Sequence, residues 1–427
     1  MSQDSAAPGQ VPPPAGWLLG FCASRVGFGF IFTTYSAALP LLRVDWGMSA
    51  REAGAIQSAW QIGYLISLFA VGFLGDRFGA KRVFLWTSLA ASAASMMFAV
   101  FADGYWSALI LYGLAALCSG GSYTPGLAIL AQQYPAQGRG RAMGYFLAAA
   151  SFGYGCSLVL SSLLFPLAGW RGAFLVTCAG PLLGTVLGFW VLRGVPNVIP
   201  PRVEEPAQGG SMMTVLRNRP AMLAMLAYMF HSWELLGMWA WLPAFLAASA
   251  AHGAGMTAQS VSLGAVFTAL TYFISMGGSI FGGGLSDRFG RTAVILVMSL
   301  SSLVCSFAFG WMFGLPFWIL VAAAIVYQFT AIGDSSIYST ALTELVPPRY
   351  VGAAYSLRSV MGFGVGAISP WIFGAVLDVT RAGAPGAESL AWGLAWTMLG
   401  VGALLGPLMT LRLRALPESG KMAGGLR

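Results

Sequence analysis

Two arginines lie within long apolar stretches of this sequence, Arg25 in residues 17–42 and Arg358 in residues 352–377. An arginine at bilayer depth costs about 2.5–3.5 kcal/mol on insertion scales, so it normally faces the interior of a helix bundle or a watery cavity. Its planar guanidinium can donate two parallel hydrogen bonds to carboxylate or phosphate oxygens. The two arginines therefore predict a buried site for an anion.

Three further ionisable residues could carry protons. His231 and Glu234 lie one helical turn apart, and Asp334 shares a helical stripe with Tyr338. Imidazole titrates near neutrality, which makes His231 beside Glu234 a candidate proton carrier. We predict a proton-coupling role for Glu234, His231 and Asp334. The alternative for each charge is an internal salt bridge, for example between Arg25 and Glu234.

The elements that must position these residues follow from the composition. Of the 427 residues, 57% are hydrophobic and 8% are charged, and the mean hydropathy is +0.75. Such a chain cannot form a soluble globule with a polar surface, so we expect an all-α integral membrane protein. A helix needs roughly 20 apolar residues to cross the bilayer. Twelve spans are predicted, near residues 17–42, 53–74, 83–102, 106–132, 142–166, 172–192, 221–249, 258–285, 293–312, 315–345, 352–377 and 389–411.

The predicted spans fall into two sets of six. Residues 17–192 would form an N-terminal bundle and residues 221–411 a C-terminal bundle. The linker between them, 193–220, is rich in proline, glycine and charge, which no bilayer core accepts. Residues 1–16 and 412–427 would be cytoplasmic tails.

Lysine and arginine are distributed unevenly between the two sets of loops. If both termini are cytoplasmic, the cytoplasmic loops and tails hold 16 of the 22, as the positive-inside rule requires. The net charge of +8 then reflects topology, and we expect no nucleic-acid partner. We predict a multi-pass plasma membrane protein, in a bacterial inner membrane, that works as a monomer in the lipid bilayer.

A charged motif occurs twice. "GFLGDRFGAKR", residues 72–82, returns as "GGLSDRFGR", residues 283–291, with its aspartate 211 positions later. Residues 152–155 ("FGYG") match residues 363–366 ("FGVG") at the same offset. Two homologous six-helix halves explain both coincidences.

Both copies resemble the signature of the major facilitator superfamily, which joins helices 2 and 3 and recurs between helices 8 and 9. The resemblance covers residues 17–411 and implies two pseudo-symmetric six-helix bundles that rock about a central site. It also implies that the motif helps to latch the cytoplasmic side while the other side is open. The first copy departs from the pattern at Ala80, where a basic residue is usual, and the alternative role for the loop is a topology signal. The implied gating residues are Gly72, Asp76, Arg77, Gly79, Arg82, Gly283, Asp287, Arg288, Gly290 and Arg291.

Two subfamily resemblances favour an anionic substrate. Residues 120–140 resemble the helix 4–5 region of monocarboxylate and oxalate/formate transporters, and the first helix with its internal arginine looks more like that of the anion:cation symporters and organophosphate antiporters. These resemblances imply a secondary transporter that moves a small organic anion, such as a monocarboxylate, by alternating access with proton coupling or anion exchange. The substrate-binding candidates are Arg25, Arg358, Tyr123, Gln61 and Tyr338.

Other functions were weighed against this one. The sequence contains no nucleophile–base constellation, metal-ligand cluster or nucleotide-binding motif, so we expect neither an enzyme nor a cofactor. A copper or neutral-nutrient transporter of the same fold and a transporter-like sensor are the alternatives. Copper is favoured only by the one-turn spacings Met225/Met229 and His252/Met256, because soft thioethers suit it. With 19 methionines in the chain, such spacings arise easily by chance.

Overall fold

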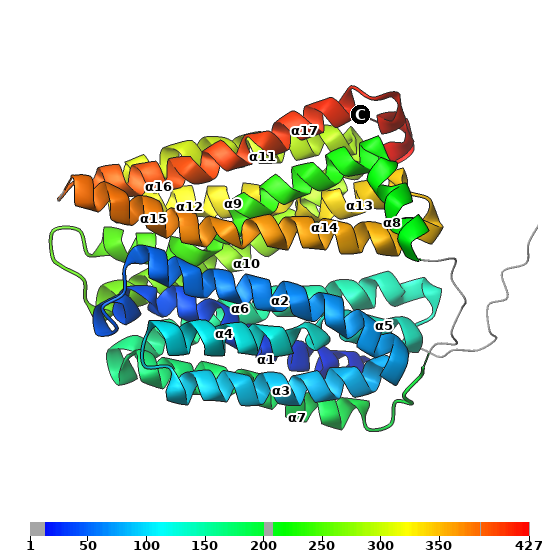
Figure 1. Ribbon diagram of the computed structural model, residues 1–427, viewed down its shortest axis with the longest axis horizontal. Helices are drawn as coiled ribbons and strands as arrows, with labels where there is room; N and C mark the ends of the chain where they lie inside the picture. The colour runs from blue at the N-terminus through cyan, green and yellow to red at the C-terminus, as the bar shows by residue number, and fades with distance from the viewer. Residues whose placement is uncertain (1–12, 200–207, 385, 427) are drawn as a thin grey trace, which may run out of the picture.

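The computed structural model describes residues 13–199, 208–384 and 386–426, and every regular element within them is helical. The helix axes run in nearly one direction, with the first half of the chain below and the second half above in Figure 1. The first half contains α1 (Ala15–Asp45), α2 (Ala50–Phe78), α3 (Ala80–Phe101), α4 (Tyr105–Ser119), η1 (Gly120–Ser122), α5 (Thr124–Gln133), α6 (Ala136–Cys178) and α7 (Gly180–Leu192).

The second half follows α8 (Gln208–Arg217), a short helix within the predicted linker. It contains α9 (Arg219–Ala250), α10 (Ala258–Phe289), α11 (Arg291–Phe309), η2 (Gly310–Met312), α12 (Phe317–Gly333), α13 (Ser335–Leu345), η3 (Pro348–Tyr350), α14 (Val351–Gly366), α15 (Ile368–Gly383), α16 (Glu388–Ala403), α17 (Leu405–Arg414) and η4 (Pro417–Gly425). The predicted C-terminal tail is therefore partly folded, and Met422 within it is fully buried. Parts of the predicted N-terminal tail and linker, 1–12 and 200–207, lie outside the described residues.

Ten helical stretches among the described residues are long and apolar enough to cross a membrane. One of them, Arg141–Leu192, has 52 residues and would extend about 78 Å if it were straight, more than twice the thickness of the hydrocarbon core. Gly169, with a φ of +64° that favours glycine, lies between its two predicted spans, so we count this stretch as two crossings. Adding α9, which has 32 residues, gives the twelve crossings of the predicted all-α membrane fold.

Two crossings are interrupted at equivalent places in the repeat. Tyr123 separates η1 from α5, and Asp334 separates α12 from α13. The two residues are 211 positions apart, which is the offset of the charged motifs. Interrupted helices in transporters supply backbone and side-chain groups to sites near the middle of the membrane. The repeat therefore places Tyr123 and Asp334 at equivalent helix breaks in the two halves.

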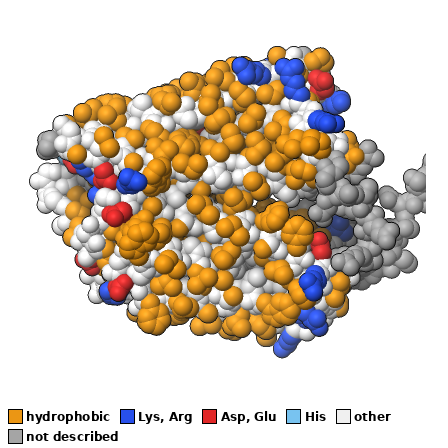
Figure 2. Space-filling model, in the orientation of Figure 1, with side chains coloured by type: hydrophobic (Ala, Val, Ile, Leu, Met, Phe, Trp, Pro, Cys, Tyr) orange, Lys and Arg blue, Asp and Glu red, His pale blue; other side chains and the backbone are white. Residues whose placement is uncertain are grey.

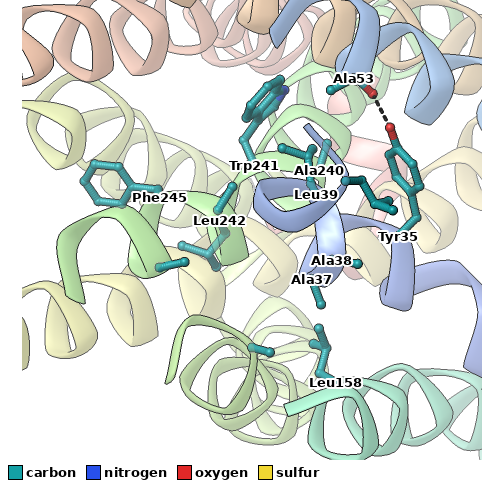
Figure 3. Packing of buried hydrophobic residues seen from close by; sticks show 14 of the residues in the cluster. Tyr35, Ala37, Ala38, Leu39, Ala53, Leu158, Ala240, Trp241, Leu242 and Phe245 are labelled. Atoms are coloured by element: carbon teal, nitrogen blue, oxygen red, sulfur yellow. Dashed lines mark hydrogen bonds between the residues drawn. The ribbon is translucent and has the colours of Figure 1, made fainter. Parts of the chain in front are cut away.

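The buried apolar residues show where the two halves are joined. One large cluster includes α1 and α9 residues and extends to the loops at 46–49 and 313–316. Figure 3 shows Leu39 of α1 close to Ala240 and Trp241 of α9 in this cluster. Toward the motif loops the clusters separate, with one built only from the first half and two only from the second half. The halves thus share a core on one face of the molecule and have separate cores on the other, which we call the motif face.

Surface composition agrees with a membrane environment. Apolar side chains cover the middle of the face shown in Figure 2, and charged side chains gather near its two ends. The visible Lys and Arg side chains are concentrated near the end that carries α8 and the C-terminus in Figure 1. Charged groups at both ends and an apolar belt between them are what a bilayer-spanning helix bundle requires.

Candidate functional site

A cavity of about 240 Å³ lies between the two halves. Arg25 of α1, Gln61 of α2 and Tyr123 line it from the first half, and Arg358 of α14 lines it from the second half. Four of the five residues predicted to bind substrate thus surround one space. The fifth, Tyr338 of α13, lies outside its wall.

Arg25 is held by neutral groups. It is 6% exposed, and its Nη1 donates to the hydroxyl of Ser122 in η1. Its guanidinium carbon lies 5.7 Å from the ring centroids of Tyr123 and Phe146. Its Nε is buried without a hydrogen-bond partner. The break between α4 and α5 therefore places a hydroxyl and an aromatic ring against a cation that keeps unused donor capacity.

Arg358 has the same kind of environment in the second half. Its Nη1 donates to the hydroxyl of Ser339 in α13, and its guanidinium carbon lies 4.4 Å from the ring centroid of Tyr228 and 4.9 Å from that of Tyr355. Its Nε also lacks a partner. Among the described residues no carboxylate forms an ion pair with Arg25 or Arg358. The salt bridge considered between Arg25 and Glu234 is therefore not formed.

Aromatic side chains form much of the cavity wall. Nine of its 21 lining residues are aromatic, whereas 13% of the whole chain is. They are Phe28, Phe32, Trp60, Tyr64, Tyr123 and Tyr154 from the first half and Tyr228, Trp239 and Phe363 from the second half. Of these nine, only Tyr123 was a predicted substrate-binding residue, because the others occur as aromatics in apolar helices without a spacing that predicts a shared cavity.

His231 pairs with Asp334. Its Nδ1 lies 3.0 Å from Asp334 Oδ1, and its Nε2 lies 2.6 Å from the hydroxyl of Ser335. The imidazole is thus fixed between the carboxylate at the α12–α13 break and the first residue of α13. The Tyr338 ring packs beside it, with centroids 5.5 Å apart. Sequence spacing predicted Glu234 as the neighbour of His231, and the fold supplies Asp334 as its direct partner instead.

Tyr228 lies between this pair and the cavity. One of its neighbours is the guanidinium of Arg358, and another is the His231 ring, at a centroid distance of 5.7 Å. Tyr228 lines the cavity, whereas His231, Glu234 and Asp334 do not. The two candidate proton carriers on α9, His231 and Glu234, therefore lie behind the cavity wall.

Glu234 faces α11 inside the second half. It is 4% exposed, and its two oxygens accept hydrogen bonds from Ser302, at 3.1 Å, and Ser306, at 2.6 Å. Ser306 also hydrogen-bonds to Tyr327 of α12. Two hydroxyl donors therefore satisfy a buried carboxyl group that no arginine contacts. Its position ties α9 to α11 and α12.

The two motif loops differ in their contacts. In the second copy, Arg291 bonds to Asp287 and places its Nη2 2.9 Å from Glu344 of α13. The position equivalent to Arg291 in the first copy is Ala80. Asp76 is exposed and forms no ion pair among the described residues. Because Ala80 carries no charge, the first loop lacks the cation that pairs with the motif aspartate in the second loop.

Other motif residues shape the loops themselves. Gly79 and Gly290 have φ values of +86° and +94°, which side-chain-bearing residues rarely adopt. Asn197 donates to the carbonyl of Phe78 at 2.8 Å and accepts from the backbone of Arg82 at 3.1 Å. The start of the predicted linker is therefore fastened to the first motif loop.

On the face opposite the motif loops, a carboxylate joins the two halves. Asp378 of α15 accepts from the backbone N–H groups of Ala50 at 2.9 Å and Arg51 at 2.7 Å, at the first turn of α2. Arg43 Nη2 lies 4.0 Å from the same carboxylate. α2 and α15 also approach closely, because a Cβ on Gly54 would lie 2.1 Å from the carbonyl oxygen of Pro370. Asp378 was missed in the sequence, since a helix N-terminus and a carboxylate 328 residues away share no local pattern.

The residue pairs that suggested copper do not come together. Met225 belongs to a buried cluster of the second half near the motif face, whereas His252 and Met256 line a pocket on the opposite face. Along α9 the separation between residues 225 and 250 is about 38 Å. The described residues also contain no group of three or more His, Cys, Asp or Glu side chains arranged to hold a metal.

Comparisons with known proteins agree with this architecture. The chain is 26% identical over 402 residues to a protein of Cupriavidus necator named "Probable sulfoacetate transporter", with 88% of this chain and 90% of the relative covered. It is 25% identical over 438 residues to the gallate transporter of Pseudomonas putida, with 94% and 93% covered. The crystal structure of a D-xylose–proton symporter superposes with a TM-score of 0.76 at 16% identity, covering 95% of this chain and 98% of that one. The family model for the Major Facilitator Superfamily matches residues 21–370. The chain therefore belongs to the major facilitator superfamily and is a membrane transporter of small solutes, not an enzyme.

Proposed function

We propose that this protein transports a small organic anion, such as a monocarboxylate, by alternating access. The observation that carries the proposal is the pair of cations, Arg25 and Arg358, that line one cavity from opposite halves without a carboxylate partner. A charge removed from water is costly unless it is paired. An anionic substrate supplies the missing counter-charge and contacts both halves at once.

The names of relatives support an acidic substrate. Sulfoacetate and gallate, the substrates in the names of two relatives, both carry a carboxylate at neutral pH. The cavity volume of about 240 Å³ lies below the roughly 300–1,000 Å³ typical of pockets for drug-sized ligands. A molecule with about a dozen non-hydrogen atoms suits a space of this size.

The separate cores at the motif face support an inward-open state. Because loops rich in lysine and arginine remain in the cytoplasm, the motif face would be the cytoplasmic face and both termini would lie there. The shared core and the Asp378 contact then close the outer face. In the alternate state the outer contact separates, the motif face closes, and Asp76 becomes available to the other half. A bacterial inner membrane is the location this orientation fits.

Proton coupling is assigned to the His231–Asp334 pair. The ring of Tyr228 neighbours both His231 of this pair and the guanidinium of Arg358. Charge introduced at Arg358 by a substrate can therefore influence whether the pair holds a proton. Glu234 accepts hydrogen bonds from two serines of α11, away from this pair, and is not assigned the coupling role. Anion exchange is the alternative mode if the pair keeps its proton throughout the cycle.

The test is uptake of labelled carboxylates into proteoliposomes, with and without a pH gradient. Arg25→Lys and Arg358→Lys keep the charge but lose the planar pair of donors, so each should weaken anion affinity by about tenfold or more. Arg171→Lys is the matched control, because Arg171 stacks on Trp170 and does not line the cavity. Near-normal anion affinity in both cavity variants would contradict the proposal and favour a neutral substrate.

A further inference from the structure

The cavity has unused hydrogen-bond donors on both sides. Arg25 Nε and Gln61 Nε2 from the first half, and Arg358 Nε from the second half, are buried without partners. Arg25 and Gln61 are 6% and 2% exposed, so bulk water does not satisfy them. Leaving a buried donor unpaired is costly, and donors contributed by both halves favour a ligand that offers acceptors to each half.

The aromatic neighbours restrict how those acceptors can approach. The Arg25 guanidinium lies over Tyr123 and that of Arg358 over Tyr228. A guanidinium that packs against a ring keeps its N–H groups for partners in its own plane. A flat carboxylate presents two oxygens in that arrangement, so each arginine favours an edge-on planar acceptor group.

The cavity that both arginines line is walled by rings from both halves. Phe32 of α1 lies 4.8 Å from Tyr154 of α6 and 6.1 Å from Trp239 of α9, measured between ring centroids. Tyr64 of α2 lies 5.8 Å from Phe363 of α14. Aromatic faces prefer offset-stacked or edge-to-face contact with other rings. A planar, apolar body is therefore the shape that this wall receives best.

We propose that the substrate is a two-ended acid with a planar apolar body, one end bound by Arg25 and Gln61 and the other by Arg358. The inference rests on the proposed transport of an organic anion and makes the substrate class specific. The amide of Gln61 can donate or accept, so the end beside Arg25 is either a carboxylate or a carboxylate flanked by a hydroxyl. A substrate of this form contacts both halves at once, so its binding couples to the conformation of each half.

The test measures dissociation constants for the purified full-length protein at neutral pH, by tryptophan fluorescence or calorimetry. The probes are terephthalate (planar, two carboxylates), benzoate (planar, one carboxylate), trans-cyclohexane-1,4-dicarboxylate (two carboxylates, not planar) and acetate. We expect terephthalate to bind about tenfold more tightly than benzoate, because a second charge-assisted contact is made. We expect it to bind about threefold or more tightly than the cyclohexane diacid, because ring contacts are lost there.

Variants locate the two ends. In Arg358→Gln the terephthalate and benzoate constants should converge, whereas Arg171→Gln should keep the tenfold ratio. Arg358→Lys, which keeps the charge but loses the planar pair of donors, should narrow the ratio without abolishing it, and it is the second variant if the glutamine variant is not monodisperse. Acids that bind with a terephthalate-to-benzoate ratio near one overturn the two-ended substrate and leave anion transport standing. Failure of every acid to bind overturns the proposed function itself.

Discussion

The contact between Asp378 and the first turn of α2 joins the two halves on the face opposite the motif loops, and its removal should shift the conformational equilibrium. In Asp378→Ala, the N–H groups of Ala50 and Arg51 lose an acceptor that comes from the other half. They would be solvated instead, and the favourable charge at a helix N-terminus would disappear. Nothing else in the described first turn of α2 replaces it, because the Ser49 cap already bonds to Glu52.

The size of the shift follows from these contacts. A side-chain acceptor at a helix N-terminus contributes about 1 kcal/mol for a typical cap, and the aspartate makes two such bonds. The carboxylate side chain is 29% exposed, so the Arg43 pair at 4.0 Å adds little beyond them. A total of about 2 kcal/mol corresponds to a roughly 30-fold shift toward the state in which this face is open. Asp378→Asn keeps one acceptor oxygen and should produce a smaller shift.

The assay measures the distance between two spin labels on the face opposite the motif loops. The five native cysteines are first replaced, and labels are attached at Val44 and Val379, which are 76% and 74% exposed on opposite halves. Asp378→Ala should populate a longer distance than the parent. Asp103→Ala is the matched control, since among the described residues the Asp103 side chain accepts a hydrogen bond only from Ser107 of its own half. An unchanged distance distribution in Asp378→Ala would refute the reasoning.

Three further predictions concern coupling, gating and packing. Asp334→Asn should abolish substrate accumulation driven by a pH gradient while sparing exchange, whereas Glu234→Gln should keep both accumulation and exchange. Uptake into proteoliposomes measures the two activities, and the reverse result would assign coupling to Glu234. Asp76→Asn should slow transport turnover without changing substrate affinity, because it removes a charge needed only when the motif face closes. Unchanged turnover would mean that the loop acts only as a topology signal. Gly282→Leu should cost about 1–3 kcal/mol of stability, because its Cβ would lie 2.1 Å from an α12 carbonyl oxygen. Gly284→Leu, with open space around its Cβ position, should leave the melting temperature nearly unchanged.

Several features of the fold could be predicted because they depend on local sequence. The cost of placing a residue in hydrocarbon is set by that residue and its near neighbours, so the spans follow from composition. The repeat and its motif loops are visible as matching letters 211 positions apart. For the same reason Arg25 and Arg358 were recognised as exceptional, since each is a costly charge in an apolar stretch.

The partners of the buried charges could not be predicted in the same way. α9 is apolar on nearly every side, so no polar stripe marks which face meets the cavity. His231 and Glu234 lie three residues apart, and this spacing rotates them about 60° from each other around the helix. That rotation is enough to direct His231 to Asp334 at the α12–α13 break and Glu234 to the serines of α11.

The sequence alone therefore determined that this protein lies in a lipid bilayer, that its two halves are repeats, and that two energetically costly arginines lie in apolar segments. Tertiary structure alone decided that the arginines share one aromatic-walled cavity, that His231 pairs with Asp334, and that Asp378 caps a helix of the other half. The physical reason is that burial cost is a property of a segment, whereas pairing depends on how rigid helices rotate and pack against one another. In helices surrounded by lipid and by other helices, hydrophobic patterning constrains that rotation only weakly.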